Sequence, residues 1–204
     1  LLQNLPEHVK LIMLGCDTEF FQNKKDALNV LNTLKNLGKD VSVITKLPLS
    51  DAYIQEISLI AKEMEDKGNI LSFSISLPCI SEKSLQKYEP KVPSPERRIE
   101  TLQKVFNNGI PTMVAIRPLL PDLEDSEVEA IIDVTKDFTI GYYSGPLYLK
   151  QETVKVLLPG FKIEEEKQPH WMLDGNPFQE VVKDGQMELL VSLVKKAGKQ
   201  FFDG

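Results

Sequence analysis

The sequence predicts an α/β fold in which parallel strands alternate with helices, as a partial (βα)-repeat barrel of the TIM type or an open parallel sheet. Five apolar, strand-like runs recur between residues 9 and 142, at intervals typical of βα units. The runs are nearly continuous instead of alternating, as expected for parallel strands covered on both faces. Residues at helical spacing fill the intervals. Periodicity alone does not separate a sheet from a barrel.

The predicted strands are Val9–Leu14, Val41–Ile44, Ile70–Ile75, Thr112–Ile116 and Phe138–Tyr142. We expect them to lie side by side in sequence order, because crossovers between parallel strands are right-handed. An antiparallel pairing of any consecutive two would contradict this fold. The first strand would be left as an apolar edge, which proteins cover with a tail or pair with another chain.

Four predicted helices connect the strands. Glycine and asparagine favour helix ends, and a serine followed by proline favours a start, because proline at the first helical position loses no needed hydrogen bond. The residues that mark these boundaries are Gly38, Gly68, Ser94 with Pro95, Asn108 with Gly109, and Asp125 with Ser126.

The pattern changes after Tyr148. A short helix is predicted over Gln151–Leu158 and a terminal helix around Met187–Val194, ended by Gly198, while the proline-containing stretch between residues 169 and 177 reads as loop. We therefore divide the chain into a barrel domain, residues 1–148, and a C-terminal extension, residues 149–204, that covers an open side of the barrel.

Composition narrows the function classes. The net charge of −6 argues against a broad nucleic-acid-binding surface. No apolar run is long enough to span a bilayer and nothing resembles a signal peptide, so a cytoplasmic protein without a membrane partner is expected. Cys16 and Cys79 are too far apart to indicate a disulfide framework or a zinc site, and packed apolar thiols in a reduced compartment are the simplest interpretation.

Polar or cationic residues follow all five strands, and in α/β folds ligands bind at the carboxyl ends of the strands. Strand ends are also where polar residues ordinarily occur, so the pattern alone leaves both interpretations open. The segments are Gly15-Cys16-Asp17-Thr18, Thr45-Lys46, Ser74-Ile75-Ser76, Arg117-Pro118 and Tyr142-Tyr143-Ser144-Gly145.

An ordered set of motifs resembles a known family. The motifs are Phe73-Ser74-Ile75-Ser76, Glu89-Pro90, Pro93-Ser94-Pro95 with Arg98, Gly109-Ile110-Pro111 and Arg117-Pro118-Leu119-Leu120-Pro121. In this order they resemble the radical S-adenosylmethionine proteins close to spore photoproduct lyase, the DNA-repair photolyase-like branch. The resemblance covers residues 9 to 148, the second to sixth strands of a six-stranded partial barrel.

The resemblance implies roles for individual residues. Lys46 matches the lysine that contacts the carboxylate of S-adenosylmethionine, and Ser74 matches a serine that hydrogen-bonds the same cofactor, with Ser76 as the competing candidate. Arg98 matches the arginine of the family motif, and its alternative role is an ion pair with Glu89.

The resemblance assigns one further residue, and strand geometry places the others around a cavity. Asp17 occupies the position of the family's Thr-Asp-Pro-Tyr, although the Pro-Tyr is missing here. Lys46 and Ser74 are expected to face one cavity, with Arg98 and Tyr142 near its rim.

One family feature is absent from the sequence. Radical S-adenosylmethionine enzymes carry Cys-x-x-x-Cys-x-x-Cys after the first strand, where three thiolates hold a [4Fe–4S] cluster and the open iron binds the cofactor. This chain has two cysteines and begins without methionine. We expect the first strand and cluster loop to lie upstream of Leu1, and the chain as it stands to be inactive and to bind neither group firmly.

Three functions follow from these observations. The first is part of a radical S-adenosylmethionine enzyme of unknown substrate, with nucleic acid as a partner by family analogy only. The second is a non-catalytic α/β domain that binds a small anionic ligand at the strand ends. The third, a barrel enzyme using acid/base chemistry, lacks a paired-carboxylate or histidine constellation. A dimer across the first strand is the expected self-association.

Overall fold

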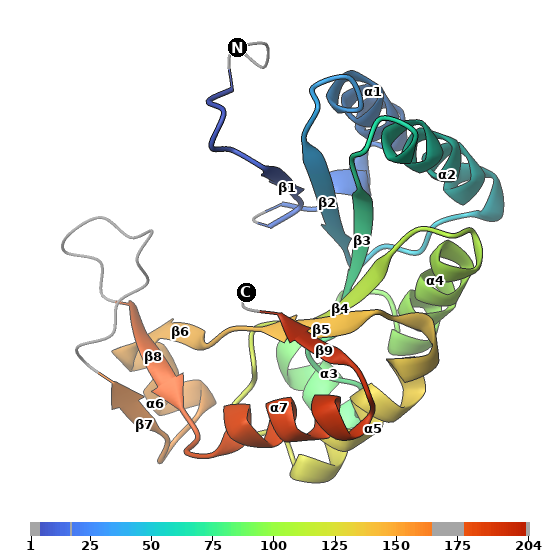
Figure 1. Cartoon of the computed structure of the whole chain (residues 1–204). Helices are drawn as coiled ribbons and strands as arrows, with labels where there is room; N and C mark the ends of the chain where they lie inside the picture. Colours follow the sequence, from blue (N-terminus) through green and yellow to red (C-terminus); the bar gives the residue numbers. More distant parts are fainter. Residues whose placement is uncertain (1–4, 17, 165–177, 203–204) are drawn as a thin grey trace.

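A computed structural model describes residues 5–16, 18–164 and 178–202. Its main sheet has six strands in the order β1-β2-β3-β4-β5-β9, and every adjacent pair is parallel. The strands are β1 (Leu11–Leu14), β2 (Asp40–Thr45), β3 (Leu71–Ser76), β4 (Thr112–Ile116), β5 (Gly141–Ser144) and β9 (Gln200–Phe202). Because β1 and β9 are the two edges, the described sheet curves but does not close into a barrel (Figure 1).

The predicted parallel α/β architecture is confirmed. The first five strands lie in sequence order, and four of them fall close to the predicted ranges. The fifth differs, since Lys136–Phe138 forms a short 3-10 helix (η3) and the strand starts at Gly141. Phe138 was predicted inside the strand, but its ring packs edge-on against Phe106, 6.3 Å between centroids.

The helices follow the predicted pattern, with η2 and α3 added to it. They are η2 (Phe20–Gln22), α1 (Lys24–Leu34), α2 (Asp51–Glu65), α3 (Glu82–Tyr88), α4 (Pro95–Asn107), α5 (Asp125–Thr135), α6 (Gln151–Leu157) and α7 (Gln186–Lys196). Helix α4 begins at Pro95 as predicted, although the Ser94 side chain makes no capping bond to the helix backbone. Helix α3 was not predicted, and its cap is Ser81, whose hydroxyl accepts from the Ser84 amide.

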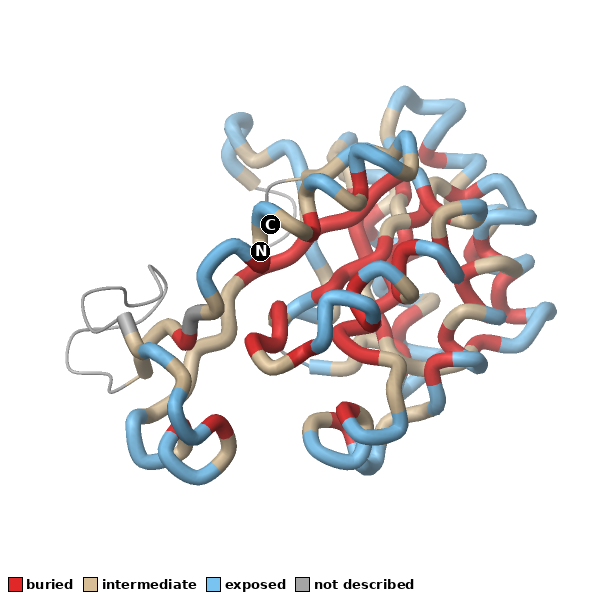
Figure 2. Tube along the Cα trace, turned by 90° about the horizontal axis from the view of Figure 1, so that it is seen from below, coloured by how far each residue is buried: buried red, intermediate tan, exposed pale blue. Residues whose placement is uncertain are grey.

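The core lies between the sheet and the helices α1, α2, α4 and α5, which cover its convex face (Figure 1). Val43 pairs with Phe73, and Val114 with Tyr142, and all four side chains are fully buried. In Figure 2 the buried residues concentrate in this body, while exposed residues occupy its outer turns. Apolar burial here is the main stabilising term of the fold.

Tyr142 belongs to this core, which corrects its predicted place at a cavity rim. Its hydroxyl lies 2.9 Å from Thr135 Oγ1 and donates to the Ile132 carbonyl at 3.2 Å, both on α5. The side chain therefore points into the helix layer, and burial raises the pKa of its phenol to about 12.

The C-terminal part builds a second, antiparallel sheet and then returns to the first. Strands β6 (Leu147–Lys150), β8 (Phe178–Val182) and β7 (Lys162–Glu164) pair in the order β6-β8-β7. Helix α7 then packs against α5, and β9 joins β5. The described part of the tail thus extends the sheet at the edge opposite β1. On β1 itself, Leu11 and Met13 remain 47% and 52% exposed. Within the described ranges, no helix is long and apolar enough to cross a membrane.

Candidate functional site

The face of the sheet opposite the helices carries the predicted cofactor residues. Strand register places Ile44 beside Ser74, so these two side chains leave the same face of the sheet, and Lys46 follows in the bend just past the end of β2. We call this face the concave face, and its members on β2 to β5 include Ser42, Ile44, Ser72, Ser74, Ser76, Ala115 and Tyr143. The sheet curves around this face in Figure 1.

Ser74 lies at the centre of the concave face. The residue is fully buried, and its hydroxyl makes no hydrogen bond of normal geometry within the described residues. The nearby Tyr143 phenol has a pKa that burial raises, and the Ser74 hydroxyl partly offsets that rise, so the two groups are close without being well aligned. A buried hydroxyl without a well-aligned partner is unfavourable in a folded protein.

Lys46 ends in an ion pair at the carboxyl end of the strands. Its ammonium lies 2.6 Å from Glu89 Oε1, and the second carboxylate oxygen lies 2.7 Å from Arg98 Nη2. Glu89 and Arg98 are 4% and 0% exposed at their side chains, whereas Lys46 is 37% exposed. We call this set the Lys46–Glu89–Arg98 triad.

Arg98 is held from two directions in the triad. Its Nη1 donates to the Ser76 carbonyl at 2.9 Å, while Nη2 pairs with Glu89. The ion pairs are close, but their angles fall outside normal hydrogen-bond geometry, and Arg98 Nε has no partner in the described structure. Arg98 therefore has the ion-pairing role that was its alternative in the sequence, and it fixes the loop after α3 to the end of β3.

Glu19 is a site residue that sequence reasoning missed. Its Oε1 accepts from Thr45 Oγ1 at 2.6 Å and from the Phe21 amide at 3.1 Å, and Oε2 accepts from the Lys46 amide at 3.0 Å. The carboxylate thus joins the loop after β1 to the end of β2 and contacts the backbone of Lys46. Asp17, the predicted residue of this loop, lies outside the described residues.

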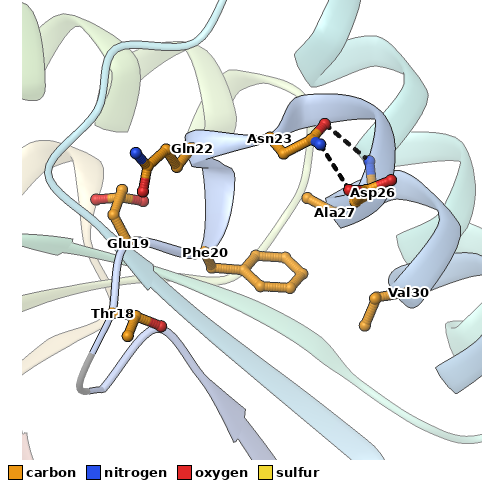
Figure 3. Close-up of a pocket in the computed structure, with 8 residues that line it drawn as sticks. All are labelled: Thr18, Glu19, Phe20, Gln22, Asn23, Asp26, Ala27 and Val30. Carbon is orange, nitrogen blue, oxygen red and sulfur yellow. Dashed lines mark hydrogen bonds between the residues drawn. The ribbon is translucent and has the colours of Figure 1, made fainter.

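A hollow of about 360 Å³ lies beside this loop, lined by Thr18, Glu19, Phe20, Gln22, Asn23, Asp26, Ala27 and Val30 (Figure 3). It sits at the start of α1, where Asn23 caps the helix by accepting from the Asp26 amide. Neither Lys46 nor Ser74 lines it. The hollow is therefore separate from the concave face that carries the predicted site.

The cysteines do not form a cluster site. Cys16 is exposed, whereas Cys79 is buried and burial raises its thiol pKa to about 12. In the parts of the chain that the structure describes, no three His, Cys, Asp or Glu side chains gather as metal ligands. Two cysteines cannot supply the three thiolates of the family's cluster, so the residues of this chain do not fit that group.

The curved parallel sheet with helices on its convex face is the fold of the partial barrel found in radical S-adenosylmethionine enzymes. It matches a domain of the pyruvate-formate lyase-activating enzyme from Bacteroides vulgatus with a TM-score of 0.64 and 11% identity, over 94% of this chain and 97% of that one. Spore photoproduct lyase matches with a TM-score of 0.61 and 10% identity, over 96% of this chain and 62% of that one.

A third solved structure is the radical S-adenosylmethionine methyltransferase TsrM from Kitasatospora setae, with cobalamin and a [4Fe–4S] cluster bound. Its TM-score is 0.59 at 16% identity, over 89% of this chain and 43% of that one. At these identities the likeness establishes the fold.

In sequence, the chain is 35% identical over 159 residues to an uncharacterized protein of Methanocaldococcus jannaschii. The match covers 72% of this chain and 57% of the relative, so the chain spans little more than half of that protein. No protein-family model matches the chain.

Proposed function

We propose that this chain is the greater part of the barrel of a radical S-adenosylmethionine enzyme, of the branch that includes spore photoproduct lyase. One observation carries the proposal. Lys46 lies just past the end of β2, and the buried Ser74 hydroxyl, which makes no well-aligned hydrogen bond in the described residues, lies on the neighbouring β3, so a carboxylate at these strand ends would meet an ammonium and a hydroxyl together. The fold is the second support, since S-adenosylmethionine enzymes share it.

The chain's own residues would bind and orient the cofactor. The Lys46 ammonium would meet its carboxylate, while Glu89 and Glu19 hold the lysine from the side chain and the backbone. The Ser74 hydroxyl would donate to a second polar atom of the cofactor. S-adenosylmethionine would supply radical chemistry at this face, with the electron coming from a [4Fe–4S] cluster that residues outside this chain would hold.

The proposal requires three cysteines that this chain does not contain. They would come from a segment that precedes Leu1 in the native polypeptide. The parent protein would act in the cytoplasm on a substrate that is not yet identified. A native reading frame without Cys-x-x-x-Cys-x-x-Cys upstream would favour the alternative, a non-catalytic domain that binds a small anion.

The test uses the protein expressed from its native reading frame and reconstituted anaerobically with iron and sulfide. We expect cluster absorbance and, after reduction with S-adenosylmethionine, release of 5′-deoxyadenosine. Lys46→Ala should weaken cofactor binding by about 1.5–3 kcal/mol, the scale of a hydrogen bond to a charged group, or roughly 10- to 150-fold in Kd. Lys62→Ala, at an exposed lysine of α2, is the matched control. A protein that holds the cluster and binds the cofactor equally well with Lys46→Ala would refute the assignment.

A further inference from the structure

Three cations, Lys46, Arg98 and Arg117, lie near the carboxyl ends of the strands, and two of them share the Glu89 carboxylate. Lys46 is paired with Glu89. Arg117 follows β4, is exposed, and forms no ion pair with any carboxylate of the described chain. An arginine that lies beside a ligand face without an anionic partner is a ready site for a carboxylate or phosphate, because its planar fork matches both groups.

The position of Arg117 is defined by a glycine on the neighbouring strand end. A Cβ atom on residue 145 would lie 3.1 Å from Arg117 Nε and 3.3 Å from Cζ, so the guanidinium rests against the bare backbone of Gly145. The Leu119 amide donates to the Gly145 carbonyl at 2.8 Å and joins the two loops. Gly145 has no positive φ, so close approach explains the glycine here.

The groups around Arg117 include hydrogen-bond donors of the concave face. Burial raises the pKa of the phenols of Tyr143 and Tyr148, and the positive charge of Arg117 partly offsets the rise in both. Tyr143 aligns with Ala115 and, through it, with Ser76 on the concave face. Glu180 on β8 is also near Tyr148, but it forms no ion pair with Arg117 in the described structure.

We propose that Arg117, resting on Gly145, binds an anionic group of the substrate, a carboxylate or a phosphate, at the ends of β4 and β5. The proposal deepens the proposed function, on which it rests for the identity of the ligand as a substrate. The anion site is distinct from the Lys46 position, because Lys46 ends at Glu89 on the α4 side of the strand ends whereas Arg117 rests on Gly145.

The experiment titrates the full chain, without cluster or S-adenosylmethionine, with inorganic phosphate and separately with succinate at constant ionic strength. Amide NMR shifts of Leu119, Ser144 and Gly145 report binding. We expect saturable shifts with at least one anion. The anion with the higher affinity shows whether the site prefers a phosphate or a carboxylate. Arg117→Gln should weaken that binding about tenfold or more, the scale of one charge-assisted hydrogen bond. Arg97→Gln, at an exposed arginine on α4, should leave it unchanged.

Two further variants separate charge from position. Gly145→Ala retains Arg117 but displaces its guanidinium, so it should weaken the binding of the anion nearly as much as Arg117→Gln does. Lys62→Ala, at an exposed lysine of α2, should leave the anion shifts in place, and the local readout at Leu119, Ser144 and Gly145 separates this result from the cofactor-binding test of Lys46. The proposal is overturned if neither anion gives saturable shifts, or if Arg117→Gln and Arg97→Gln behave alike.

Discussion

Removing the Glu89 carboxylate should destabilise the fold more than any surface ion pair. Glu89→Ala leaves the Arg98 guanidinium fully buried, with only its bond to the Ser76 carbonyl. Breaking a buried pair by removing one partner typically costs about 3–5 kcal/mol, because an uncompensated charge remains. Lys46 adds little to this figure, since its side chain is 37% exposed and solvent screens its charge.

The assay is urea unfolding followed by circular dichroism, with the m-value checked for each variant. Glu89→Gln should cost less than Glu89→Ala, roughly 1.5–3 kcal/mol, because the amide oxygen can still accept from Arg98. Glu63→Ala is the matched control, as the Glu63–Lys35 pair is half exposed at the carboxylate and surface pairs contribute about 0–1 kcal/mol.

A double variant tests the cause of the effect. Replacing Arg98 with leucine in the Glu89→Ala background removes the stranded charge, so much of the lost stability should return. A loss below about 1 kcal/mol for Glu89→Ala, or no recovery in the double variant, would refute the view that Glu89 compensates a buried guanidinium.

Two other predictions concern parts of the fold that support the site. Burial opposes the charged form of Glu127, but hydrogen bonds from the Ser81 and Ile80 amides and from serine hydroxyls outweigh it and lower its pKa. The stabilisation of the fold by ionised Glu127 is therefore complete above the unfolded-state pKa and is lost as the pH falls through the lower folded-state pKa. Glu127→Gln should flatten the acid side of a plot of unfolding free energy against pH. An unchanged plot would contradict this prediction. Gly141→Ala should weaken the pairing of β9 with β5, because the added Cβ would lie 2.4 Å from the Gln200 carbonyl oxygen. We expect the amides of β9 to exchange their hydrogens faster in this variant than in the wild type.

The order and direction of the main strands were predictable, because long apolar runs and helical periodicity are local signals. Strands β7 and β9 have three residues each and carry no such signal. Their assignment depends on tertiary pairing with β8 and β5.

The tyrosine error has a simple physical cause. The fifth strand was predicted to end at Tyr142, but it covers Gly141–Ser144. Period-two alternation puts Tyr142 with the core residues Val114 and Ile75 and leaves Tyr143 on the concave face. The boundary of a short strand is too weakly encoded to settle which of two adjacent tyrosines faces a ligand.

The shared face of Ile44 and Ser74 follows from alternation along two neighbouring strands, whereas the direction of Lys46, which lies past the end of β2, stays a prediction. The partners of Lys46 were not predictable, since Glu19 and Glu89 reach it from loops remote in sequence. Glu89 was expected to pair with Arg98, and the structure adds Lys46 to the same carboxylate. Their roles toward a cofactor remain predictions.

The polarity of any strand that adds to the free edge of β1 would reveal where it comes from. A strand that extends the βα order on the same polypeptide would run parallel to β1, as its present neighbour β2 does. The β1 strand of a second copy, related by a twofold axis perpendicular to the sheet, would instead run antiparallel to β1. Parallel and antiparallel ladders space their hydrogen bonds differently. The pattern of protected amides along Leu11–Leu14 would therefore tell completion within one molecule from self-association.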